Sequence, residues 1–95
     1  MTLLASTVSL EDLREGIERL ERPEWVRAIE LTEGPDADDD MALWAWIVLE
    51  PEFPPQEEVQ PALAALRKHI REYLSGQVPG LWAYVRVRES GEGNR

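Results

Sequence analysis

The most apolar stretch of the chain is Met41–Glu50, where hydrophobic residues follow one another almost without interruption. Trp44, Trp46, Ile47 and Val48 are of the aromatic and β-branched types that favour strands, and a run of about ten residues suits a strand better than a helix. The pattern therefore predicts a central strand. Because both of its faces are apolar, both would need to be covered.

The segment before it shows a helical pattern followed by a strand pattern. Large aliphatic residues recur at helical spacing over Leu10–Glu21, with charged residues between them, which predicts an amphipathic helix. Ser9 suits the N-cap, Asp12 follows at the capping-box position, and Pro23 would end the helix. Trp25–Thr32 alternates as a strand does.

The acidic segment Glu33–Asp40 joins this strand to Met41–Glu50, with Gly34 and Pro35 as turn residues, and predicts an antiparallel hairpin. After the central strand, the prolines Pro51, Pro54 and Pro55 lead into a second helix.

An apolar stripe marks this second helix, at Val59, Leu63, Leu66, Ile70, Tyr73 and Leu74. Pro61 lies inside the stripe, so the helix begins either near Gln60 or near Gln56 with a kink. Because the stripe already starts at Val59, the longer helix is favoured. Gly76 is suited to the C′ position that follows a helix.

The last strong pattern is the period-two alternation of Val78–Glu89, which predicts a strand. A strand–helix–strand crossover would make this strand parallel to the central one. The predicted fold is a two-layer α+β sandwich of the ferredoxin-like or KH-like kind, in the order helix-strand-strand-helix-strand. It forms one domain over residues 1–95 with its core at about 9–89, and residues 1–8 and 90–95 are expected to be flexible.

The segment IVLEPEFPPQEEVQPALAALRKHIREYL, with the element order around it, resembles the cytoplasmic domain of cation diffusion facilitators. That resemblance implies a ferredoxin-like fold. The family binds zinc through histidines and acidic residues and also has a membrane domain. This sequence has one histidine and no membrane segment, so the resemblance bears on the fold rather than on transport or zinc.

A face of the predicted sheet is rich in aromatic and arginine side chains. If the small residues of the last strand face the helices, Trp82, Tyr84, Arg86 and Arg88 face away, as do Trp44 and Trp46 of the central strand. Trp25 and Arg27 could join them. Residues of these types are enriched at protein interfaces and their hot spots. The alternative is that some of the tryptophans belong to the core.

Composition limits the chemistry that the chain can perform. The protein has 95 residues, 43% of them hydrophobic, and a net charge of −9, which disfavours general binding to nucleic acid. It has no cysteine and one histidine, which excludes disulfides, thiolate metal sites and multi-histidine sites within one chain. Since neither a signal peptide nor a membrane span is evident, we expect a soluble, cytoplasmic protein.

The acidic loop and the histidine are the remaining chemical candidates. Asp36, Asp38 and Asp40 have the spacing that opens a calcium-binding EF-hand loop, but Met41 and Ile47 stand where glycine and glutamate are needed. We interpret the loop as a solvated hairpin tip with weak metal-binding potential. His69 is interpreted as a residue at the boundary of the second helix. No catalytic motif is present, so we lean against an enzyme and expect no cofactor.

The function that the sequence supports best is a homodimeric or protein-binding interaction module that uses Trp44, Trp46, Trp82, Tyr84, Arg86 and Arg88 as its contact face. Small-ligand binding is a further possibility. An alternative is stacking of single-stranded bases on the same face, as in RRM domains, although the net acidity disfavours nucleic acid. A second alternative is an enzyme whose site lies at a dimer seam, where two His69 side chains could meet.

Overall fold

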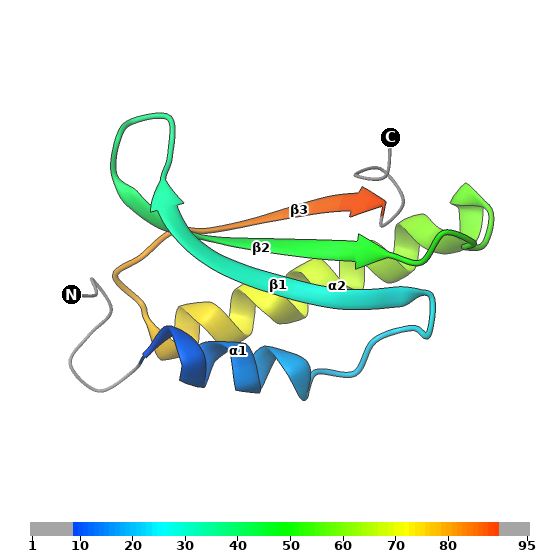
Figure 1. Ribbon diagram of the computed structural model, residues 1–95, viewed down its shortest axis with the longest axis horizontal. Helices are drawn as coiled ribbons and strands as arrows, with labels where there is room; N and C mark the ends of the chain where they lie inside the picture. The colour runs from blue at the N-terminus through cyan, green and yellow to red at the C-terminus, as the bar shows by residue number, and fades with distance from the viewer. Residues whose placement is uncertain (1–8, 90–95) are drawn as a thin grey trace.

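The computed structural model describes residues 9–89, which form two helices and a three-stranded sheet. Both helices lie on the same side of the sheet (Figure 1). The predicted two-layer α+β sandwich and its element order are confirmed. The predicted flexibility of residues 1–8 and 90–95 lies outside the described residues. In chain order the elements are α1 (Leu10–Glu18), β1 (Val26–Pro35), β2 (Met41–Leu49), α2 (Gln56–Gln77) and β3 (Ala83–Glu89).

Strand β2 is the centre of the sheet, whose order is β1-β2-β3. It pairs antiparallel with β1, from Val26 opposite Leu49 to Pro35 opposite Met41. It pairs parallel with β3 along the whole of that strand. The central position predicted from its two apolar faces is therefore confirmed, as is the parallel β3 predicted from the crossover through α2.

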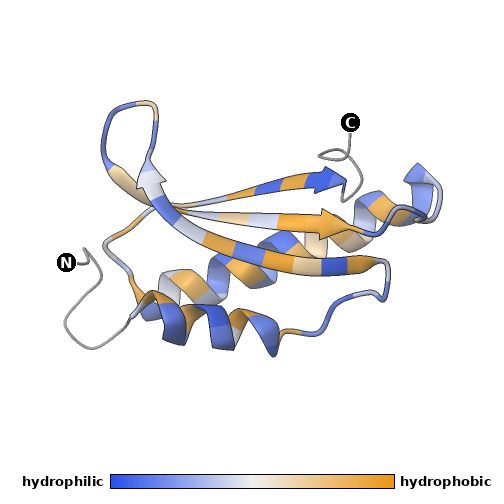
Figure 2. Cartoon of the chain, in the orientation of Figure 1, coloured by the Kyte–Doolittle hydropathy of each residue, from blue (hydrophilic) through white to orange (hydrophobic). Residues whose placement is uncertain are grey.

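The core lies between the sheet and the two helices. Figure 2 shows hydrophobic and hydrophilic residues alternating along β1 and β3. Because successive side chains of a strand point to opposite faces, the alternating residues Leu43, Ala45 and Ile47 of β2 all enter the core, where they are nearly or wholly buried. The helices contribute residues at helical spacing, chiefly Leu13, Ile17, Val59, Leu63, Leu66, Ile70 and Leu74.

Helix α1 begins as predicted and ends earlier. The Ser9 side-chain oxygen accepts a hydrogen bond from the Asp12 backbone N–H at 3.1 Å, which confirms the N-cap. The helix ends at Glu18 rather than Glu21. The N–H groups of Arg19 and Leu20 bond to the carbonyls three residues before them, and such tight final turns are common where a helix ends.

Helix α2 is the longer of the two alternatives, beginning at Gln56 and containing Pro61. The ring of Pro61 is exposed, and it lies on the opposite side of the helix from the buried stripe. Gly76 lies inside the helix, which runs on to Gln77, so its assignment to the C′ position was wrong. Gly76 does not have the positive φ typical of a C′ glycine. The last hydrogen bond at this end of α2 is donated by the Val78 N–H to the Leu74 carbonyl, at 2.8 Å.

Two strand boundaries also differ from the prediction. Val78 is buried in the core and its carbonyl accepts from the Leu81 N–H, so a turn precedes β3, which begins at Ala83. Strand β1 continues through Pro35, beyond the predicted end at Thr32. Its register shifts between Val26 and Ala28, which is a β-bulge.

The contact between the helices depends on Gly16 of α1. A Cβ atom at this position would lie 1.7 Å from Oη and 2.3 Å from Cζ of Tyr73 in α2. Gly76 offers a matched control, since nothing lies within 4 Å of a Cβ there. Both residues are helical, so both substitutions gain the same intrinsic helix propensity.

We predict that Gly16→Ala lowers the free energy of unfolding by about 1–3 kcal/mol, because the half-buried Tyr73 ring must be displaced. Gly76→Ala should instead raise it by up to about 1 kcal/mol. Denaturant unfolding of both variants measures the difference. A Gly16→Ala protein as stable as the Gly76→Ala protein would show that the ring moves aside freely.

Candidate functional site: the aromatic–arginine face

The side of the sheet away from the helices carries a cluster that we call the aromatic–arginine face. Its members are Trp44 and Trp46 of β2 and Tyr84, Arg86 and Arg88 of β3. Trp44 lies opposite Tyr84, and Trp46 lies opposite Arg86. The pairing brings together residues some forty positions apart in the sequence.

Trp44, Tyr84 and Arg86 form a compact stack on this face. The rings of Trp44 and Tyr84 have centroids 4.7 Å apart and planes inclined by 23°. The Arg86 guanidinium carbon lies 5.5 Å from the Trp44 ring centroid and 5.9 Å from that of Tyr84. Offset stacking and cation–π attraction both stabilise such an arrangement. The Trp44 indole also donates a hydrogen bond to the Gly34 carbonyl at 3.3 Å.

A second cluster lies further along the same face. The Arg88 guanidinium lies 5.6 Å from the Trp46 ring centroid and forms an ion pair with Glu30 of β1. Arg86 differs from Arg88, because it forms no ion pair with a carboxylate within residues 9–89. Among residues 9–89, Arg86 is therefore an exposed cation held over aromatic rings without a carboxylate in an ion pair.

The large side chains cover the backbone and the small residues beneath them. Ala42 is 0% exposed and Val48 is 6% exposed, although their alternation with Trp44 places them on the side away from the helices. Since α1 and α2 lie on the other side of the sheet, the cover that residues 9–89 can offer them is the neighbouring large side chains of this face. This accounts for how a strand apolar on both faces is tolerated with only one helical layer.

The acidic hairpin, Asp36–Asp40, adjoins this face. One Asp36 carboxylate oxygen accepts from the backbone N–H groups of Asp38 and Asp40, at 2.8 and 3.1 Å, and the other accepts from the Tyr84 hydroxyl at 3.2 Å. Asp39 takes a positive φ of 66°, a conformation that aspartate tolerates better than most residues. In Figure 1 the hairpin rises from the sheet on the side away from the helices.

Of the three metal candidates Asp36, Asp38 and Asp40, the structure gives the side chain of Asp36 a structural role. Both oxygens of Asp36 already accept hydrogen bonds from the chain, so this residue organises the hairpin and fixes it to β3. In the part of the chain that the structure describes, no group of three or more acidic residues or histidines is arranged to hold a metal ion. Asp38, Asp39 and Asp40 are exposed, which agrees with a hairpin tip in solvent.

The pKa of Tyr84 is raised above its usual value near 10. Partial burial of the phenol is the largest cause, followed by the negative charge of Asp36 and its hydrogen bond to the hydroxyl. Asp38 adds a further negative charge, whereas Arg86 acts in the opposite direction. These causes show that the acidic hairpin and the aromatic stack share one electrostatic environment.

Trp82 lies just before β3 and is 72% exposed. Its carbonyl accepts from the Leu43 N–H at 2.9 Å, so backbone pairing between the strands continues to this residue. Its position two residues before Tyr84 puts it at the hairpin end of the aromatic–arginine face. The structure thus places five of the six predicted residues on β2 and β3 and Trp82 just before β3, and their use as a contact face stays a prediction.

Trp25 and Arg27 do not join the face, contrary to the sequence-based expectation. The bulge leaves Arg27 without a partner in the register, and both Val26 and Ile29 enter the core. Trp25 is partly buried and packs against the edge of the core. For this tryptophan the structure agrees with the alternative stated above, that some of the tryptophans belong to the core. The corresponding places on β1 are occupied by Glu30 and Thr32, opposite Trp46 and Trp44.

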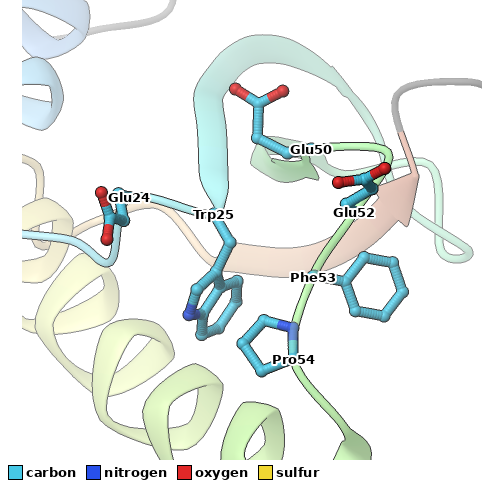
Figure 3. Close-up of a pocket in the computed structure, with 6 residues that line it drawn as sticks. All are labelled: Glu24, Trp25, Glu50, Glu52, Phe53 and Pro54. Carbon is cyan, nitrogen blue, oxygen red and sulfur yellow. The ribbon is translucent and has the colours of Figure 1, made fainter.

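Trp25 also lines a shallow pocket of about 410 Å³, together with Glu24, Glu50, Glu52, Phe53 and Pro54. Figure 3 shows that these side chains diverge. The Trp25 and Pro54 rings lie together, the Phe53 ring points away from them, and the carboxylates do not converge on a common point. We assign no ligand to this pocket.

His69 is exposed on α2, as predicted for a boundary residue.

A comparison with protein families, curated proteins and solved structures finds no match to this chain. The resemblance to the cytoplasmic domain of cation diffusion facilitators thus stays a prediction. Neither helix described within residues 9–89 has the length and apolar character needed to cross a membrane.

We predict that the Tyr84 phenol loses its proton at a higher pH than an ordinary tyrosine does, because its pKa is raised. Subtracting the alkaline absorbance titration of Tyr84→Phe from that of the unchanged protein isolates this group. Asp36→Asn should lower the midpoint, because it removes a negative charge yet keeps a side-chain oxygen for the backbone of the hairpin. Since the pKa is higher in the folded protein, Tyr84 contributes stability below about pH 10 that is lost as the pH rises through the folded value.

Asp39→Asn is the matched control for this titration, because it makes the same charge change in the same hairpin and asparagine tolerates the positive φ. Asp39 is not among the causes of the shift, so its substitution should leave the midpoint nearly unchanged. Equal effects of the two substitutions would contradict a direct contact between Asp36 and Tyr84.

Proposed function

We propose that this protein is an interaction module, and that the partner bound by its aromatic–arginine face is a second copy of the same chain. The observation that supports the proposal best is the cluster of the half-buried Trp44, Trp46 and Tyr84 with the exposed Arg86, on the side of the sheet away from both helices. Tryptophan, tyrosine and arginine are the residue types that contribute most to binding at protein interfaces.

The face is also preorganised for binding. Trp44 is stacked on Tyr84 and bonded to Gly34, and the Tyr84 hydroxyl is bonded to Asp36. Side chains held in this way lose little conformational freedom when a partner arrives, which reduces the entropic cost of association. Trp44 and Trp46 are both half-buried, so the rest of the protein restrains part of each ring while another part stays exposed to a partner.

A second copy is the favoured partner because the face and its surroundings carry both signs of charge. Arg86 and Arg88 lie on the face, and the exposed aspartates of the hairpin lie at its margin. An isologous interface brings the same patch of two subunits together, so a patch with both signs can be complementary to itself. We further propose that the module acts in the cytoplasm, where a cysteine-free chain needs no disulfides.

The alternative of single-stranded nucleic acid draws support from the same stack, because bases stack on aromatic rings beside arginines. The adjacent aspartates oppose it, since they would repel phosphates. This alternative predicts binding to single strands that weakens steeply with salt and disappears in Trp44→Ala. Titration of a labelled single-stranded RNA at two salt concentrations separates the two functions.

We predict that Trp46→Ala weakens self-association by about 2 kcal/mol or more, a roughly 30-fold rise in Kd, if this residue is a hot spot. Trp82→Ala should also weaken it, with little effect on folding because the side chain is 72% exposed. Sedimentation equilibrium over a range of concentrations measures both.

Phe53→Ala is the control, because Phe53 is an exposed aromatic residue outside the face. Its Kd should equal that of the unchanged protein. A chain that is monomeric at every concentration, or a dimer that both tryptophan variants leave unaffected, would refute the proposed function.

A further inference from the structure

The two ends of the aromatic–arginine face differ in charge. Tyr84 is paired with Trp44 near the hairpin, and Arg86 and Arg88 follow along β3 in the direction away from it. Beyond the first end lie the exposed side chains of Asp38, Asp39 and Asp40. The face therefore runs from an acidic end, through aromatic rings, to an end with two arginines, of which Arg88 is paired with Glu30 and Arg86 forms no ion pair within residues 9–89.

The negative end stands out from the sheet. The hairpin rises on the side of the face (Figure 1), and the bond between the Asp36 carboxylate and the Tyr84 hydroxyl holds it there. The contribution of Asp38 to the raised pKa of Tyr84 shows that its charge, too, lies near the ring. A flat surface placed against this face would meet the hairpin as a raised rim.

The size of the face favours participation of the adjoining hairpin in a stable interface. Three strands about 4.8 Å apart, with seven paired positions about 3.3 Å apart, make a patch on the order of 15 by 25 Å. That is small beside the roughly 800 Å² that each partner contributes to a standard interface. Contact with the raised hairpin is the available way to extend it.

Two copies that place these faces together about a twofold axis have two limiting arrangements with aligned strands. If the axis runs along the strands, like ends meet and the two aspartate hairpins lie side by side, which is repulsive. If the axis runs across the strands, the copies are antiparallel, and each hairpin lies over the arginine end of the other copy. Repulsion between the aspartate hairpins disfavours the first arrangement, and the exposed Arg86 favours the second.

The order of residues along β3 supports the same choice. The outward positions run Trp82, Tyr84, Arg86, Arg88, which is two aromatic residues followed by two arginines. When this row is laid antiparallel on its own copy, aromatic rings face guanidinium groups at every position, which is the cation–π pairing. On β2, Trp44 of one copy then meets Trp46 of the other.

We infer that the protein forms an antiparallel, face-to-face dimer in which the acidic hairpin of each copy binds the Arg86–Arg88 end of its partner. This inference rests on the proposed function, because it presumes that the face associates with a second copy. It adds the orientation of that copy and assigns the hairpin a role in recognition.

The test reverses the charge of each end separately. One variant combines Asp38→Lys with Asp40→Lys. It leaves Asp36, which holds the hairpin, and Asp39, which has a positive φ, unchanged. The other variant combines Arg86→Glu with Arg88→Glu. Each variant alone should dimerise more weakly by roughly tenfold or more, because like charges then face each other.

The equimolar mixture of the two variants should recover a dimer, now a heterodimer. In it the lysines of one variant face the glutamates of the other, and the unchanged aspartates face the unchanged arginines, so both contacts join opposite charges. Native mass spectrometry distinguishes the heterodimer from the two homodimers. Glu15→Lys combined with Glu72→Lys makes the same charge change on the exposed surface of the helices and should leave dimerisation unchanged.

The outcomes separate the two proposals. A monomeric unchanged protein refutes the proposed function itself. If the unchanged protein dimerises and both reversed variants dimerise equally well, only the antiparallel arrangement is refuted. That result indicates pairing through another surface, such as the edge of β3. Loss of dimerisation in both variants without recovery in the mixture also refutes the arrangement.

Cross-linking provides a second measurement that does not depend on the reversed variants. The chain contains no cysteine, so introduced thiols are the only ones present. A mixture of Asp38→Cys and Arg88→Cys proteins should form a cross-linked heterodimer faster than Asp38→Cys protein cross-links to itself. The opposite order would place hairpin against hairpin and overturn the inference.

Discussion

The rest of the structure depends on one constraint, which is that strand β2 is apolar on both faces while the helices cover one. Leu43, Ala45 and Ile47 are buried against α1 and α2. The opposite positions are shielded by a layer that the sheet builds from its own large side chains, so that Val48 stays buried without a helix above it. A layer made of tryptophan, tyrosine and arginine covers the strand incompletely, and what remains exposed is chemically suited to bind another protein.

The contacts within this layer connect three segments that are distant in the sequence. Asp36 orders the hairpin and accepts the Tyr84 hydroxyl, Tyr84 stacks on Trp44, and Arg86 lies over both rings. Because each contact restrains the next, the hairpin and the aromatic stack form one unit. An ordered hairpin of this kind can offer its exposed aspartates in a defined position, which a mobile acidic loop could not do at the same entropic cost.

The distribution of charge matters more here than its total. A net charge of −9 argues against general affinity for nucleic acid, yet the face itself carries arginines held against aromatic rings. Arginine suits such a place, since its planar guanidinium stacks on rings and is weakly hydrated compared with an ammonium group. The proposed second copy of the chain would have to accommodate the surrounding acidity, which the arginines of the face would help it to do.

The sequence by itself determined the elements, their order and the core-facing residues of both helices, β2 and β3, because hydrophobic periodicity and strand alternation are local properties. The tertiary structure decided the rest. The bulge at Arg27 directed Trp25 to the core edge, since one unpaired residue inverts the alternation that follows it. The early end of α1 and the inclusion of Gly76 in α2 depend on turns and packing that propensity does not encode. The bond from Asp36 to Tyr84 joins residues 48 positions apart, and only the folded sheet brings them together.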